Sequence, residues 1–99
     1  MRTAIETARS IAQGMDIRNE SVKISRCQLS TKAIRDIARR DVVDFYFIAA
    51  LSSALLEEGW CFFQVSDSNY GLIRRESVEG FRKMSGIMLS NLVTQREAL

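Results

Sequence analysis

The feature that most constrains the fold of this chain is an abrupt change of character at residue 41. Residues 23–40 carry six basic side chains against one acid, Asp36, a net charge of +5. Residues 41–59 carry four acids and no basic residue, a net charge of −4, around a block of apolar side chains. A strand–turn–strand pattern follows at once. A basic helix, an apolar helix and a hairpin in this order predict an α+β domain.

The 99 residues predict one domain, 1–99, in which every apolar stripe enters a single core or an oligomer interface. The chain has 46% hydrophobic residues, no proline and five glycines, which favours an ordered fold of helices with short connections. Residues 1–15 are interrupted by charges, unlike a secretory signal. No uncharged run is longer than the twelve residues of 45–56, which is short of the roughly 20 residues that span a bilayer. We therefore expect no membrane partner.

The spacing of apolar residues predicts helices over 3–13, 31–40, 42–58 and 81–95, a short strand over 22–27 and a hairpin over 60–76. Gly14 is expected to end the first helix, and Ser30 or Thr31 to cap the second. Asp41 is expected to cap the third helix, and Gly86 to interrupt the last. The turn of the hairpin is predicted over 67–71.

The predicted core draws on the first three helices and on the hairpin. Its members are Ile5, Ala8, Ile34, Ile37, Phe47, Ile48, Leu51, Leu55, Phe63 and Val65. The helix after residue 41 is apolar over more than half of its circumference. Such a helix is either central to the core or covered on a second side by a partner.

Side chains suited to catalysis are scarce. The chain has no histidine, which removes the usual general base and a common zinc ligand. Asp67, Asn69 and Gly71 resemble the start of a calcium loop, but the glycine comes one position early and Glu76 two positions before the expected acid. A plain hairpin turn is favoured. We expect no catalytic residue, no metal, no cofactor and no small-molecule substrate.

The two cysteines, Cys27 and Cys61, are far apart and fit no metal or redox spacing. This usage predicts a cytoplasmic protein with two reduced thiols.

Nucleic-acid binding is the first functional hypothesis. Six cations on the basic helix and the hairpin are predicted to contact the phosphates of double-stranded DNA, giving salt-dependent affinity. They are Lys32, Arg35, Arg39, Arg40, Arg74 and Arg75. The helix after residue 41 has no Arg, Lys, Asn or Gln with which to read bases. The competing interpretation pairs these arginines with the acids of residues 41–59.

The second hypothesis is a protein–protein interface. Its predicted residues lie on the apolar helix and in the last helical segment, where small and Met side chains allow close packing. They are Tyr46, Ala49, Ser53, Met84, Met88 and Leu92. A homodimer built on either helix, with 81–99 as a dimerisation helix, is favoured over a monomer in which the two stripes meet.

The run from Val22 to Gly80 resembles the winged helix-turn-helix superfamily in its order of elements. The resemblance is carried by Leu29-Ser30-Thr31, Arg40-Asp41, Gly59-Trp60 and Gly71-Leu72-Ile73. It implies a small winged-helix-like domain with three or four helices and a two- or three-stranded hairpin sheet. The pattern is also similar to small proteins of phages and other bacterial mobile elements.

The resemblance implies a non-catalytic DNA-binding or regulatory protein, which is the leading hypothesis from the sequence. Winged helices also serve as protein-binding modules. The alternative is therefore a protein–protein interaction adaptor or inhibitor that binds no nucleic acid.

Overall fold

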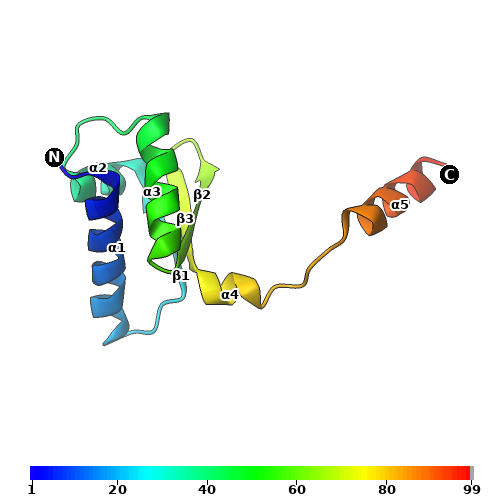
Figure 1. The fold of residues 1–99 in the computed structure, drawn as a ribbon, viewed down its shortest axis with the longest axis horizontal. Coiled ribbons are helices and arrows are strands. Elements are labelled where there is room, and N and C mark those ends of the chain that lie inside the picture. The colour runs from blue at the N-terminus through cyan, green and yellow to red at the C-terminus, as the bar shows by residue number, and fades with distance from the viewer. Residues whose placement is uncertain (99) are drawn as a thin grey trace.

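The computed structural model describes residues 1–98 and confirms the predicted α+β, winged-helix-like fold class (Figure 1). These residues form five helices, where three or four were expected. The elements are α1 (Ala4–Asn19), β1 (Arg26–Ser30), α2 (Thr31–Ala38), α3 (Phe45–Glu57), β2 (Trp60–Ser66), β3 (Asn69–Arg74), α4 (Arg75–Glu79) and α5 (Gly86–Glu97). The three strands form one antiparallel sheet in the order β1-β3-β2. α3 packs on the sheet through β2, and α1 lies alongside α3.

The first helix is longer than the sequence indicated. A capping box holds its start: the Thr3 hydroxyl accepts from the Glu6 amide at 3.1 Å, and the Glu6 carboxylate accepts from the Thr3 amide at 3.0 Å. The helix passes through Gly14 and ends at Asn19, so the predicted stop at Gly14 is wrong. A helical glycine costs only about 1 kcal/mol. The packing of Met15 against the core, one residue further on, keeps the helix going.

The cap of α2 is the one predicted from the sequence, and the cap of α3 is not. Ser30 caps α2 as predicted, its hydroxyl accepting from the Ala33 amide at 3.0 Å. Asp44, not Asp41, caps α3 by accepting from the Phe47 amide at 2.8 Å. The helix therefore starts at Phe45, and residues 41–43 belong to the connection. Either acid can cap a helix by its chemistry, and the tertiary position of Phe47 in the core decides between them.

The sheet is shifted relative to the prediction. β1 begins at Arg26, where it pairs with Ile73, and not at Val22. The β2–β3 turn is the two-residue segment Asp67-Ser68, so Tyr70 and Gly71 belong to β3 and not to the turn. β3 ends two residues before the predicted end of the hairpin at residue 76, because Arg75 already starts α4.

The core lies between the helices and the inner face of the sheet. Its buried members are Ala8, Ile11 and Ala12 of α1, Ile34 and Ala38 of α2, Phe47, Leu51 and Leu55 of α3, and Trp60, Phe62, Tyr70 and Leu72 of the sheet. Ile37 and Ile48 are partly buried against it. Three predicted core residues are wrong: Ile5, Phe63 and Val65 are 57%, 51% and 53% exposed. On β2, Trp60 and Phe62 point inward, and their odd-numbered neighbours therefore point outward.

The C-terminal part of the chain leaves the body. α4 packs on β3 and β2, residues 80–85 then run without regular structure, and α5 lies apart (Figure 1). We call residues 80–98 the arm. Ser85 caps α5 by accepting from the Met88 amide at 2.9 Å, so the helix starts at Gly86 and not at residue 81. Every residue from Glu79 to Ala98 is exposed.

We expect Leu51→Asp to unfold the protein. Leu51 is fully buried on α3, and removing a buried leucine side chain alone costs roughly 2–5 kcal/mol. An uncompensated buried charge adds to that cost. Circular dichroism with thermal melting is the measurement. Ser53→Asp, at an exposed position of the same helix, is the matched control and should melt like the wild type. A soluble, cooperatively melting Leu51→Asp protein would contradict this core.

Candidate interaction surfaces

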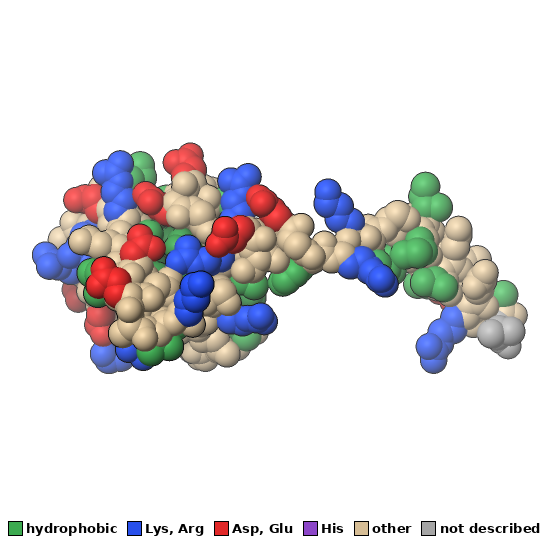
Figure 2. Space-filling view, turned by 90° about the horizontal axis from the view of Figure 1, so that it is seen from below, with side chains coloured by type: hydrophobic (Ala, Val, Ile, Leu, Met, Phe, Trp, Pro, Cys, Tyr) green, Lys and Arg blue, Asp and Glu red, His purple; other side chains and the backbone are tan. Residues whose placement is uncertain are grey.

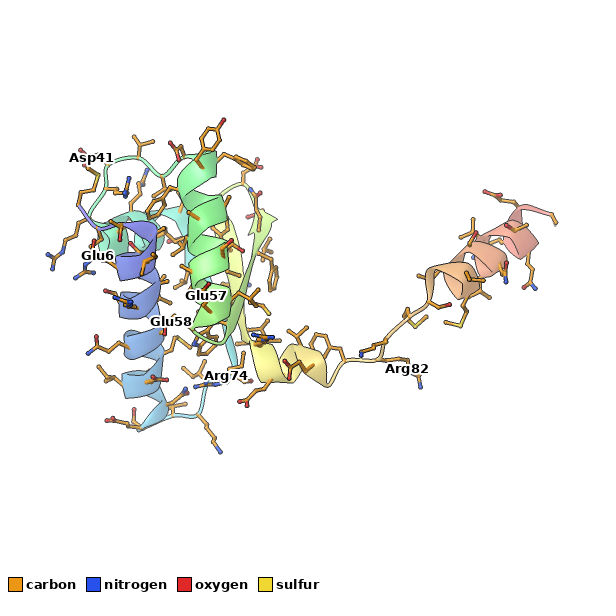
Figure 3. All side chains as sticks on the ribbon, in the orientation of Figure 1. Glu6, Asp41, Glu57, Glu58, Arg74 and Arg82 are labelled. Carbon is orange, nitrogen blue, oxygen red and sulfur yellow. The ribbon has the colours of Figure 1, made fainter. Side chains whose placement is uncertain are left out.

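The six cations predicted from the sequence lie in two separate groups. Lys32, Arg35, Arg39 and Arg40 lie on α2 or just after it, and α2 begins beside the β2–β3 turn, where the Thr31 amide donates to the Ser68 carbonyl at 2.8 Å. Arg74 and Arg75 lie at the other end of β3. Five steps along that strand span about 16 Å. Figure 3 shows Asp41, which follows α2, and Arg74 at opposite ends of the body. The two groups therefore do not form one basic surface.

Two of these arginines are held by aromatic rings of the fold. The guanidinium of Arg40 lies 4.2 Å from the centroid of the Phe47 ring, and its Nε donates to the Arg2 carbonyl at 3.0 Å. The guanidinium of Arg74 lies 4.6 Å from the centroid of the Trp60 ring, and Nη2 is 3.9 Å from Asp16 Oδ1. Cations stacked on rings that belong to the core stabilise the fold. Their charge is correspondingly less available to a ligand.

The other cations differ in their partners. Lys32 pairs with Asp36 at 2.9 Å and Arg75 with Glu79 at 3.3 Å, both across one helical turn at the exposed surface. Such pairs contribute only ~0–1 kcal/mol and open readily. Arg35 and Arg39 form no ion pair with any of the described residues. These two side chains are the cations most available for a phosphate.

The exposed side of α3 is apolar. Phe45 and Tyr46 are 79% and 81% exposed, and their rings form an edge-to-face pair with centroids 5.9 Å apart. Ala49, Ala50 and Ser53 continue this side toward the C-terminal end of the helix, and all three are exposed. We call these five residues the α3 face. It contains the predicted interface residues Tyr46, Ala49 and Ser53. Phe45 was not among them, although its place directly after a capping acid would have marked it as a residue of the first turn.

Grooves flank the α3 face on both sides. A groove of about 370 Å³ lies between α3 and β2, lined among others by Phe45, Ile48, Ser52 and Phe63. Phe62 and Tyr70, stacked with ring centroids 5.0 Å apart, also line it. We call it the α3/β2 groove. A second groove, of about 420 Å³ and lined by Ala4, Ile5, Ala50 and Ala54 among others, lies between α1 and α3. The α3 face is therefore a ridge with an apolar groove on each side.

Acidic side chains lie near both ends of α3. Asp41 and Asp44 precede the helix, and Glu57 and Glu58 lie at its C-terminal end (Figure 3). Only Glu58 has a basic neighbour within reach, Arg9 at 4.0 Å, among the residues that the structure describes. On the face of the body seen in Figure 2, acidic and basic side chains are interspersed, so this face is not of a single sign.

The remaining predicted interface residues lie on the arm. Met84 is in the segment that leads to α5, and Met88 and Leu92 are on α5 itself. They are 50%, 43% and 54% exposed, and the arm to which they belong projects away from α3 (Figure 1). The structure thus places the two halves of the predicted interface on separate surfaces.

The described residues offer little for catalysis or metal binding. No group of three or more His, Cys, Asp or Glu side chains among them could hold a metal ion. Burial raises the pKa of the Cys27 thiol, which lowers the fraction of reactive thiolate. Its Sγ lies 4.0 Å from Met15 Sδ, against the core. No helix of residues 1–98 has both the length and the apolar character needed to cross a membrane.

No family model matches this chain, and neither the curated proteins nor the solved structures gave a match.

Arg39→Gly tests how the backbone conformation at this position affects folding. Arg39 ends α2 with φ 55°, in the left-handed region that glycine adopts without strain. We expect the substitution to raise the free energy of unfolding by ~1 kcal/mol, as measured by urea denaturation. Arg35→Gly is the matched control, because it places glycine within the same helix and should lower stability by ~1 kcal/mol. A lower urea midpoint for Arg39→Gly would be inconsistent with this cap.

Proposed function

We propose that this protein is a non-catalytic protein–protein interaction module that binds its partner through the α3 face and the α3/β2 groove. The observation that carries the proposal is the exposure of two adjacent aromatic rings, Phe45 and Tyr46, beside an apolar groove. Exposed aromatic side chains next to a pocket are typical of the residues that dominate binding energy in protein interfaces. They also enlarge the apolar surface in water, a cost that binding a partner removes.

The rest of the α3 face fits the same kind of partner. Ala49, Ala50 and Ser53 are short, so the backbone of a partner helix can approach α3 closely. The α3/β2 groove next to them can take one or two apolar side chains. The acids near the ends of α3 favour a partner with basic side chains around an apolar centre. We therefore propose an amphipathic helix with basic flanks as the ligand.

Base reading by α3 is disfavoured by the chemistry of its surface. In the winged-helix-like arrangement α3 is the helix that would enter the major groove of DNA. Its 13 residues include no Arg, Lys, Asn or Gln, the side chains that normally read bases. Asp41 and Asp44 beside its N-terminus would repel phosphates.

A second candidate function is sequence-independent contact with nucleic-acid phosphates by α2. It is favoured by the side chains of Arg35 and Arg39, which form no ion pair with described residues, and by Lys32 on the same helix. A contact of two or three phosphates would be weak and strongly dependent on salt. Arg74 and Arg75 would not join it, because they lie at the far end of β3.

A cytoplasmic location is part of the proposal. Both cysteines are free, and Cys27 is half-buried, as expected for a chain that folds with reduced thiols.

Site-specific photo-crosslinking tests the proposed surface. A benzophenone amino acid at position 46, with the protein produced in its native cells, should give a discrete covalent adduct with a partner. The same group at position 13, exposed on α1, is the matched control and should give none. With the partner purified, Tyr46→Glu should weaken binding at least about tenfold, as expected for a central aromatic residue. Equal adducts from both positions, or unchanged affinity, would count against the α3 face.

Duplex binding tests the second candidate separately. Fluorescence anisotropy with a nonspecific DNA fragment at ~50 and ~200 mM salt reports phosphate contacts through the salt dependence of affinity. The proposed function predicts no measurable binding, or weak binding that Tyr46→Glu leaves unchanged. Steeply salt-dependent binding that is lost in the Arg35→Glu, Arg39→Glu double variant would instead make α2 the functional surface.

A further inference from the structure

The helix of the arm has an apolar side that no part of its own chain covers. Met88, Leu89, Leu92 and Val93 are 43–56% exposed and recur at spacings of one and four residues, which places them on one side of α5. The opposite side carries the uncharged polar residues Ser90, Asn91 and Thr94 together with Ile87, and Arg96 follows Leu92 by one turn on the apolar side. An isolated helix of 12 residues is marginal in water. The structure of the arm therefore calls for a surface on which α5 packs.

The sheet of the body offers a matching surface on its outer side. Phe63 and Val65 point away from the core and are 51% and 53% exposed, and both line a hollow of about 510 Å³ together with Ile73. We call Phe63 and Val65, together with Ile73, which is only 9% exposed, the outer sheet face. The solvated side of an antiparallel sheet is normally polar, as Arg26 and Gln28 are on β1. The outward side chains Phe63 and Val65 of β2 are instead apolar, and β2 is also an edge strand.

The total exposed area supports association. The accessible surface is 7455 Å², whereas a compact monomer of 11.2 kDa is expected to expose about 5,700 Å². The excess is about 1,800 Å² per chain, or about 3,500 Å² for two chains. Obligate dimers bury about 2,000–5,000 Å² in total. The excess surface is thus of the size that a stable dimer buries.

We propose that α5 of each copy packs on the outer sheet face of a second copy, so that two chains form a two-fold dimer by exchanging their arms. The lengths agree, since 12 helical residues span about 18 Å and the seven residues of β2 about 23 Å. The arm extends to the side of the sheet opposite α1, where a second body can face the sheet (Figure 1). A two-fold axis between the bodies makes both contacts equivalent.

The path of the chain favours a second copy over the chain's own sheet. α4 packs on β3 and β2 and directs residues 80–85 away from the body. The last backbone hydrogen bond before the cap of α5 is that of the Phe81 amide to the Val78 carbonyl, at 2.9 Å. Folding back onto its own sheet would require a reversal between Gly80 and Gly86, whereas this segment runs away from the body in the structure (Figure 1). The arm-exchanged dimer requires no reversal.

Light scattering coupled to size exclusion, on the full chain over a wide range of concentrations, tests the proposal. The wild type should have twice the 11.2 kDa mass of one chain. Leu92→Glu on α5 and Val65→Lys on the sheet should each give a folded monomer, since both positions are more than half exposed. Thr94→Glu, on the side of α5 opposite the apolar residues, is the matched control and should remain a dimer. A monomeric wild type, or a dimeric Leu92→Glu variant, would overturn the proposal.

Mixing the two monomeric variants identifies the surfaces. In a heterodimer of Leu92→Glu with Val65→Lys, one arm–sheet contact is wild-type and the other brings the new acid against the new base. We expect the mixture to restore the dimer mass. Pairing of the two α5 helices with each other predicts no restoration, because one arm always carries the acid. A mixture that stays monomeric would therefore rule out arm–sheet exchange.

The formation of an intermolecular disulfide tests the same contact if Val65→Lys does not fold. With both native cysteines replaced by alanine, a Val65→Cys copy and a Leu92→Cys copy should form an intermolecular disulfide under mild oxidation. The matched control moves the second cysteine to position 94, on the side of α5 opposite the apolar residues. Equal yields from positions 92 and 94 would show that the apolar side of α5 does not face β2.

Discussion

The burial of Trp60 decides the character of the whole sheet. Its ring is 1% exposed beneath α3 and carries the Arg74 guanidinium on its face. Because side chains alternate along a strand, an inward Trp60 brings Phe62 inward and sends Phe63 and Val65 outward. The same alternation places Phe62 beside Tyr70, at the α3/β2 groove. The α3/β2 groove and the outer sheet face, the two apolar surfaces of the body, both result from the inward orientation of Trp60.

The sequence predicted the order of elements because each helix carries a clear apolar stripe and each main connection carries turn or cap residues. It could not predict which side of β2 is buried. Residues 60–63 are all apolar or aromatic, so both alternations are equally good in the sequence, and only the shape of the core distinguishes them. The error at Gly14 has a similar origin, because the packing of Met15 outweighs a local preference that is worth little.

The candidate surfaces were partly predictable for the same reason. Tyr46, Ala49 and Ser53 share one side of a helix by spacing alone, and the structure places them together with Phe45. The prediction of a single basic surface depended on the distance between α2 and the end of β3 in the folded chain. It also depended on which aromatic rings stack against the cations, and the sequence does not show that Phe47 lies against Arg40. Spacing along the chain holds no information about either.

Every buried side chain of the described chain lies between Thr7 and Ile73, in the body. Folding stability and the chemistry of the arm are therefore encoded in different stretches of sequence. Substitutions after residue 80 can change the length or charge of α5 without opening the core. In a chain of 99 residues, about a fifth of the sequence can therefore change without the loss of a core contact.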